Sequence, residues 1–212
     1  ELNKIMQAQI KKKDTYEAGI ATLFDLRNQL MECLTSFHKE LSRKDFDAIP
    51  FINTDGYHSK TIAYSIWHIF RIEDIVAHTV ITEDEQVFFT GNYQVRINSP
   101  IITTGNELVK QQIADFSKQL NLEELYSYIF EVRESTEKIL ERFSYDELKW
   151  KIPDERKGYL KSLNVVNCDE KAIWLIDYWC SKDIRGLIQM PFSRHWIMHT
   201  EACLRIKNKI HS

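Results

Sequence analysis

The scarcity of chain-breaking residues is the feature that most constrains the fold. Only six glycines and four prolines occur in 212 residues, so long uninterrupted segments remain between them. Within these segments apolar residues recur every three or four positions, which is the spacing of one face of an α-helix. A many-turned β fold is typically richer in glycine and proline than this chain. The sequence therefore predicts an all-α protein.

The periodicity predicts four long helices, which together indicate a four-helix bundle. Their expected ranges are residues 14–43, 60–81, 121–143 and 191–210. The second range, "KTIAYSIWHIFRIEDIVAHTVI", is apolar on most sides, so we expect it at the centre of the bundle. Asn121 with Glu124 three residues later resembles a capping box, and Pro191 suits the first turn of the last helix.

The segments between these helices are less regular. Residues 83–105 are expected to form a long crossover, followed by a short helix at 106–119. Residues 159–190 are expected to add one or two short helices before the last long one. We expect a single domain over residues 1–212, because a chain of this length fits one hydrophobic core.

Charge and hydropathy argue against several kinds of partner. The formal net charge is −3, and the basic cluster Lys11–Lys13 is too small for a nucleic-acid footprint. No stretch of about 18 apolar residues predicts a membrane-spanning helix, and residues 1–14 lack the apolar core of a signal peptide. The four cysteines form no CxxC pair, and none stands out as a nucleophile. We expect a cytoplasmic protein that acts on a small molecule, without nucleic-acid or membrane partners.

The segment "FSRHWIMHTEACLRIKNKI", residues 192–210, contains the most informative pair of side chains. His195 and His199 are four residues apart, so they differ by about 40° around a helix axis. Both lie on the stripe that continues through Ala202 and Ile206, which we expect to face the core. Imidazoles at i and i+4 can bind one divalent ion, as in HExxH helices, but Trp-Ile-Met between them includes no general base. The alternative is a pair of hydrogen-bonded core histidines.

A third histidine strengthens the metal interpretation. His68 lies in the middle of the expected central helix, and an unpaired imidazole in a core costs about 1–3 kcal/mol. One metal ion would provide a partner for all three rings. His78 lies about 80° further around the helix and nearly three turns along it, too far to share the ion. The remaining histidines, which lie in charged, loop or terminal segments, are weaker candidates: His38, His58 and His211.

Two segments resemble the DinB/YfiT-like superfamily. "TIAYSIWHIFRIEDIVAHTVI" resembles the second helix of its members, which carries a histidine in a W-H-I-x-R-x-E-D setting. "RHWIMHTEACLRI" resembles their final helix, which carries H-x3-H. The resemblance spans most of the chain in helix order. It implies a DinB-like four-helix bundle in which His68, His195 and His199 bind one divalent metal ion, zinc or nickel.

The resemblance also implies two classes of activity. Some members look like metal-dependent hydrolases, and others transfer or isomerise groups with a low-molecular-weight thiol such as bacillithiol or mycothiol. Three neutral imidazoles leave the ion its full charge and an open position for water or a thiolate. Homodimers are common among members, and the oligomeric state stays open. Many members follow the last histidine with Arg-Gly-Gln, whereas this chain has Thr200-Glu201-Ala202, so no specific substrate carries over.

The sequence identifies no catalytic acid or base. Glu73 and Asp74 lie about 140° and 120° from His68 around the helix, so we expect structural ion pairs with Arg71 or another helix. Ser65 lies closer to His68 and could support it from behind. A non-catalytic bundle, stress-related or partner-binding, with structural histidines is therefore the alternative function.

Two further groups of side chains keep open roles. Arg185 and Arg194 are either solvated or bind an anionic substrate. The aromatic group Trp174, Tyr178 and Trp179 either packs in the core, lines the mouth of a pocket or belongs to a dimer interface.

Overall fold

The computed structural model describes all 212 residues, which form helices and no strand. The prediction of an all-α protein is therefore confirmed. The long segments are α2 (Tyr16–Glu40), α4 (Ile62–Asp74) continued by the π-helix η3 (Ile75–Thr82), α8 (Leu122–Leu140), and the π-helix η5 (Met190–Arg194) continued by α12 (His195–Ile210). These segments match the four predicted ranges to within about one turn at each end.

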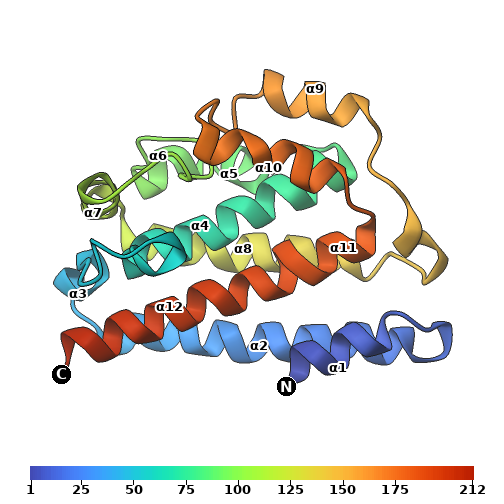
Figure 1. Ribbon diagram of the computed structural model, residues 1–212, viewed down its shortest axis with the longest axis horizontal. Coiled ribbons are helices and arrows are strands. Elements are labelled where there is room, and N and C mark those ends of the chain that lie inside the picture. Colours follow the sequence, from blue (N-terminus) through green and yellow to red (C-terminus); the bar gives the residue numbers. More distant parts are fainter.

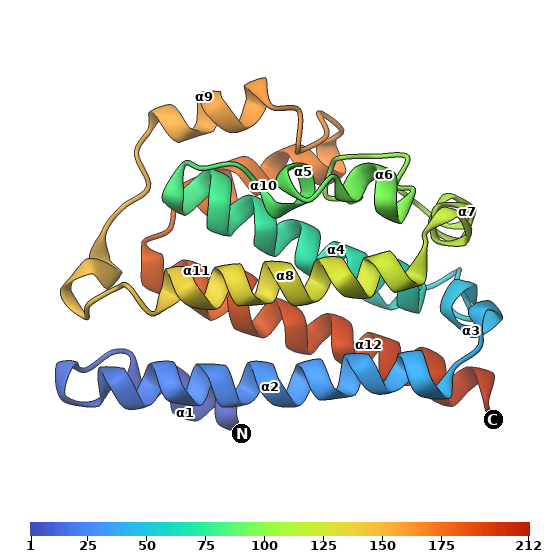
Figure 2. The same cartoon turned by 180° about the vertical axis from the view of Figure 1, so that it is seen from behind.

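The helix α4 lies at the centre of the four. It contacts α8 and α12, and α2 in turn contacts both of these helices. Figure 1 shows α12 in front of α8 with α2 below them, and Figure 2 shows the same arrangement from behind. Every residue of α4 is buried, which confirms its predicted central position. None of the helices combines the length and apolar character that a bilayer-crossing segment requires.

Shorter elements surround this core. The crossover holds α5 (Val87–Thr90), α6 (Tyr93–Ile97) and α7 (Gln111–Gln119), and the segment before η5 holds η4 (Asp146–Lys149), α9 (Glu155–Ser162), α10 (Glu170–Cys180) and α11 (Ile184–Gln189). The remaining elements are α1 (Leu2–Gln9), η1 (Lys13–Thr15), α3 (Arg43–Asp47) and η2 (Gly56–His58). The short helix predicted at 106–119 is confirmed as α7. The crossover and the segment before η5 are more helical than predicted, and α1, which packs along α2, was not predicted.

A buried ion pair positions α12 against α2 and α4. Arg27 of α2 donates to both carboxylate oxygens of Glu73 on α4, at 3.0 and 2.7 Å. The indole Nε1 of Trp196 on α12 donates to the same carboxylate at 2.7 Å, and the Arg27 guanidinium lies 4.2 Å from the centre of the indole ring. All three side chains are fully buried. The expected structural role of Glu73 is confirmed, with a partner that the sequence did not identify.

Asp74 fastens the crossover to the core. Its carboxylate accepts hydrogen bonds from the backbone N–H groups of Val87 and Phe88 at the start of α5, at 2.9 and 2.8 Å. It also accepts one from the Tyr128 hydroxyl at 2.9 Å and lies 3.6 Å from Arg71. The predicted pairing with Arg71 is therefore confirmed. Because these three hydrogen bonds come from the crossover and from α8, Asp74 holds both segments against α4.

This arrangement predicts unequal costs for two tyrosines of α8. Tyr128→Phe should lower the free energy of unfolding by about 1.5–3 kcal/mol, because its hydroxyl donates to a charged carboxylate. Tyr126→Phe, the matched control, should cost about 0.5–1.5 kcal/mol, because that hydroxyl donates to the neutral carbonyl of Leu34. Urea unfolding of both variants measures the difference. Equal costs, or a larger cost for Tyr126→Phe, would contradict the view that Asp74 accepts the Tyr128 hydrogen bond as a charged carboxylate.

Candidate metal centre

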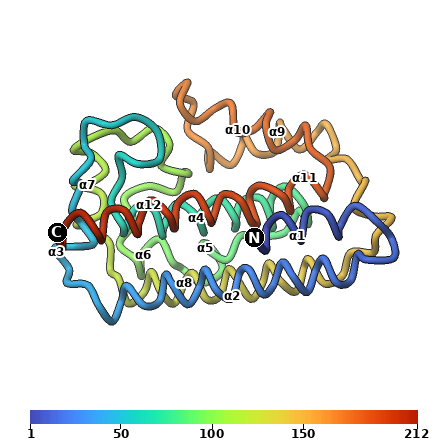
Figure 3. Tube along the Cα trace, turned by 60° about the horizontal axis from the view of Figure 1, so that its bottom comes forward, coloured from blue at the N-terminus to red at the C-terminus, as the bar shows by residue number.

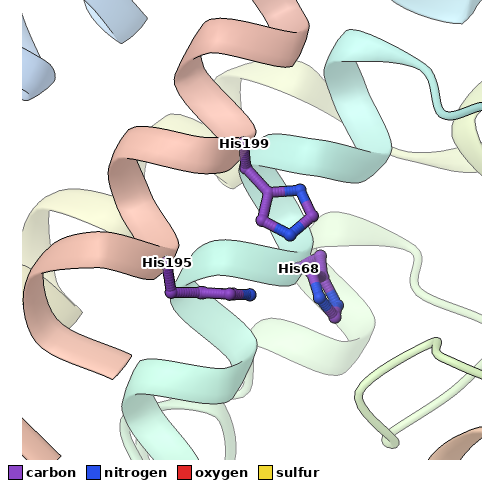
Figure 4. A group of neighbouring side chains, drawn as sticks. All are labelled: His68, His195 and His199. Carbon is purple, nitrogen blue, oxygen red and sulfur yellow. The ribbon is translucent and has the colours of Figure 1, made fainter. Parts of the chain in front are cut away.

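The three predicted histidines meet in the core. His68 lies on α4 and both His195 and His199 lie on the first two turns of α12. Their ring centres are 5.1 Å (His68 to His195), 4.8 Å (His68 to His199) and 4.5 Å (His195 to His199) apart. One nitrogen from each ring lies within 4.8 Å of the others. Figure 4 shows the rings pointing toward a common region between the two helices.

A backbone carbonyl fixes the orientation of His68. Its Nδ1 lies 2.6 Å from the carbonyl oxygen of Thr104, and because a carbonyl only accepts, Nδ1 carries the proton. The neutral ring then presents an unprotonated Nε2 to the cluster, which is the arrangement that metal-binding histidines use. From the sequence, Ser65 was a candidate for this supporting role. The structure does not confirm it: the Ser65 hydroxyl is buried without a hydrogen-bond partner, and Thr104 of the crossover supports the ring instead.

One face of α4 holds the crossover in the position from which the Thr104 carbonyl reaches His68. The Tyr64 hydroxyl donates to the carbonyl of Gly105 at 2.9 Å, and the Arg71 guanidinium donates to that of Ile102 at 3.0 and 2.8 Å. Gly105 has a φ of +76°, and a Cβ there would lie 3.0 Å from the ring of Tyr64. A glycine is therefore required for this loop to approach α4 so closely. The sequence pattern did not identify this contribution.

Burial keeps all three imidazoles neutral. It lowers the pKa of His68 to about 4 from the ordinary 6.5, although the hydrogen bond to Thr104 acts in the opposite direction. Burial, followed by the proximity of His68, also lowers the pKa of His195 well below its ordinary value. The pKa of His199 is lowered in the same way, first by burial and then by His195 and His68. Protons therefore do not compete for the ring nitrogens near neutral pH.

The residues fit a divalent ion. The Nδ1 atoms of His195 and His199 are buried without a hydrogen-bond partner, which costs about 1–3 kcal/mol for each group. The predicted alternative of hydrogen-bonded core histidines therefore does not apply to these two rings. Tetrahedral zinc with bonds of about 2.0–2.1 Å places its ligand nitrogens about 3.4 Å apart, so a small inward shift of the rings would close the cluster around an ion. Three buried histidines could thus hold one metal ion.

A cavity of 720 Å³ opens beside the cluster and is lined by His195 and His199. Its walls come from the loop before α4, the crossover, α10, η5 and the start of α12. In Figure 3 the loop before α4 and helix α10 both lie above α12. The predicted aromatic group lines this cavity: Trp179 is buried, and Trp174, 49% exposed, lies toward the solvent. The pocket interpretation of this group is confirmed, and Trp179 also packs in the core.

Acid–base groups are sparse around the cavity. Asp55, exposed on the loop before α4, is the only carboxylate among its lining residues. The lining also includes Tyr57, whose ring centre is 6.1 Å from that of His199, and Lys60. None of these three residues was predicted from the sequence. A signal existed for Lys60, because a lysine just before a helix N-terminus opposes the positive end of the helix dipole.

The other candidate residues lie outside the site. His78 bonds Asp84 through Nδ1 at 2.7 Å and Ser135 through Nε2 at 3.0 Å, which ties the end of η3 to α8. The expectation that it cannot share the ion is consistent with this separate network. Arg185 and Arg194 do not line the cavity, and Arg194 is exposed, as expected for a solvated side chain.

No protein-family model matches the sequence, and no curated protein sequence matches it. The cluster and its cavity are therefore the observations from which a function can be argued.

Proposed function

We propose that this protein is a DinB/YfiT-like metal-dependent enzyme that acts on a small molecule, of thiol S-transferase or hydrolase type. His68, His195 and His199 would bind one divalent ion, zinc or nickel. The observation that carries the proposal is the convergence of three neutral, buried imidazoles at the edge of a large cavity. Neutral imidazoles are the form in which histidine binds metals, and a cavity beside them gives a substrate access.

The chemistry of such a site follows from its ligands. A divalent ion held by three neutral histidines keeps its full positive charge and lowers the pKa of a water or thiol bound at its open position. The chain's own residues orient the three metal ligands and enclose the cavity beside them. Thr104 holds the tautomer of His68, and Trp196, anchored by Glu73, fixes the rotation of the helix that carries the other two ligands. The aromatic side chains of α10 form an apolar wall on one side of the cavity.

A non-catalytic, partner-binding bundle is the second candidate function. One observation favours it: the only carboxylate among the cavity-lining residues is Asp55, on an exposed loop. Hydrolysis commonly uses a side chain that moves a proton at the reacting group. Thiol transfer depends less on such a group, because a thiolate is itself a strong nucleophile. The sparse acid–base lining therefore favours the transferase within the first proposal.

An activity assay tests the proposal. Zinc- or nickel-loaded protein should accelerate the reaction of bacillithiol with 1-chloro-2,4-dinitrobenzene, or the hydrolysis of p-nitrophenyl acetate. His199→Ala should lower the rate at least about 100-fold, because even residues that only support a metal ligand contribute about 10–100-fold. His78→Ala, a buried histidine outside the cluster, is the matched control and should keep the activity. Turnover that persists in His199→Ala or without metal would contradict the proposal.

A further inference from the structure

Lys60 is an unpaired cation in the wall of the cavity. It is half-buried, and burial lowers the pKa of its ammonium with no carboxylate close enough to oppose the effect. Its Nζ lies 5.2 Å from the centre of the Tyr64 ring, which shields it from water without neutralising it. Partly desolvated charges in proteins are normally paired. Lys60 therefore lacks the anionic partner that is usual for a partly buried ammonium group.

The balance of charges around the cavity favours an anion. Its lining contains three lysines, Lys60, Lys110 and Lys171, against the single carboxylate of Asp55. Lys110 and Lys171 are exposed, and Lys171 lies 3.6 Å from Asp169, so Lys60 is the cation nearest the interior. The histidines contribute no negative charge because they are neutral. A bound divalent cation would add to the positive potential and attract anions further.

The apolar wall of the cavity favours a second property of the ligand, an apolar body. Trp174, Tyr178 and Trp179 of α10 line the cavity together with Met190 and Met198. A volume of 720 Å³ lies within the range of about 300–1,000 Å³ that small organic ligands occupy, far more than an ion and its water need. An apolar or aromatic body would pack against this wall. One ligand can meet both requirements when an anionic group is attached to such a body.

We propose that the cavity binds a small organic anion with an aromatic or bulky apolar body, and that Lys60 recognises its anionic group beside the histidine cluster. The inference rests on the proposed function, because it names the class of substrate for the same site. Lys60 would act in binding and specificity and not in the ligation of the metal. The aromatic group of α10 would hold the body of the ligand.

Two probes of equal shape test the role of the charge. Binding of 2-naphthoate and of the neutral 2-naphthalenemethanol is measured by calorimetry, with zinc-loaded protein and with protein treated with EDTA. Wild-type protein should bind the carboxylate at least about tenfold more tightly than the alcohol. Lys60→Met should remove this preference in the EDTA-treated protein and reduce it in the zinc-loaded protein, where the metal ion still attracts the carboxylate, and Lys60→Arg should retain most of it. Lys110→Met, an exposed lysine of the same cavity, is the matched control and should change the affinity less than about threefold.

A variant of the aromatic group of α10 tests the contribution of the apolar wall. Trp174→Ala should weaken both probes by a similar factor, about three- to tenfold, because it removes stacking area and no charge. Wild-type protein that binds neither probe, or binds both equally, would overturn the inference. A carboxylate preference that is undiminished in Lys60→Met but disappears with EDTA would assign recognition to the metal, which overturns the role of Lys60 and supports the proposed function. A Lys60-dependent preference in a protein that takes up no metal would support anion recognition and contradict the proposed function.

Discussion

The double variant H195A/H199A should bind no stoichiometric zinc, whereas the wild-type protein should hold about one ion per chain. These two side chains supply two of the three converging ligands, and His68 alone cannot hold an ion in the core. Free zinc at 100 times the dissociation constant should stabilise the wild type by about 2.7 kcal/mol, and this stabilisation should be absent in the variant. Elemental analysis after dialysis and thermal unfolding with and without zinc measure both effects.

The loss of metal in H195A/H199A should not come from unfolding. The Nδ1 atoms of His195 and His199 make no hydrogen bond, so their removal breaks no buried pair, and the metal-free variant should fold. His78→Ala is the control, because His78 is equally buried but bonded to Asp84 and Ser135. It should keep the metal while losing some stability. Wild-type protein without bound metal and without a shift on zinc addition would end the metal proposal.

Glu73→Ala should lower the free energy of unfolding by about 3 kcal/mol, because it removes the fully buried, bidentate partner of Arg27 and leaves the guanidinium only its ion pair with the partly exposed Glu137. The substitution also leaves the indole N–H of Trp196 without its acceptor. Glu134→Ala is the matched control: its partner Lys138 and Glu134 itself are solvent-exposed, so its effect should be close to zero. Urea unfolding of the two variants measures the contrast.

Glu73→Ala should also affect the metal centre. Trp196 lies directly after His195 on α12, and its hydrogen bond to Glu73 fixes how that helix is rotated. Glu73→Ala should therefore weaken zinc binding in the fraction that still folds, although no ligand has changed. The double variant R27M/E73L should recover much of the lost stability, since a matched apolar pair leaves no buried charge. Equal stability of Glu73→Ala and the wild type would show that the pair does not position α12.

Much of the fold was accessible from the sequence because helices are local structures. The periodicity of the long segments depends on neighbours three or four residues apart, and the structure reproduces all four. Two short-range signals have structural counterparts: Pro191 lies in the first turn of the last helical segment, and the Asn121 side chain accepts from the backbone N–H of Glu124. The predicted capping box is only half formed, because the Glu124 side chain pairs with Arg96 and the backbone N–H of Asn121 donates to the carbonyl of Ile97 instead. The helix α1 was missed because only Met6 of its eight residues is buried, which leaves little pattern to detect.

The sequence by itself determined which histidines lie on core-facing helix surfaces, since helix geometry converts spacing into direction. Only the tertiary structure decided that the rings converge, because nothing in the spacing of two helices far apart in the chain sets their distance or crossing. The same limit applies to Thr104, whose carbonyl reaches His68 across 36 positions, and to Arg27, whose partner Glu73 lies 46 positions away. Such contacts depend on how whole helices pack, and the free energy that selects the packing is spread over the entire core.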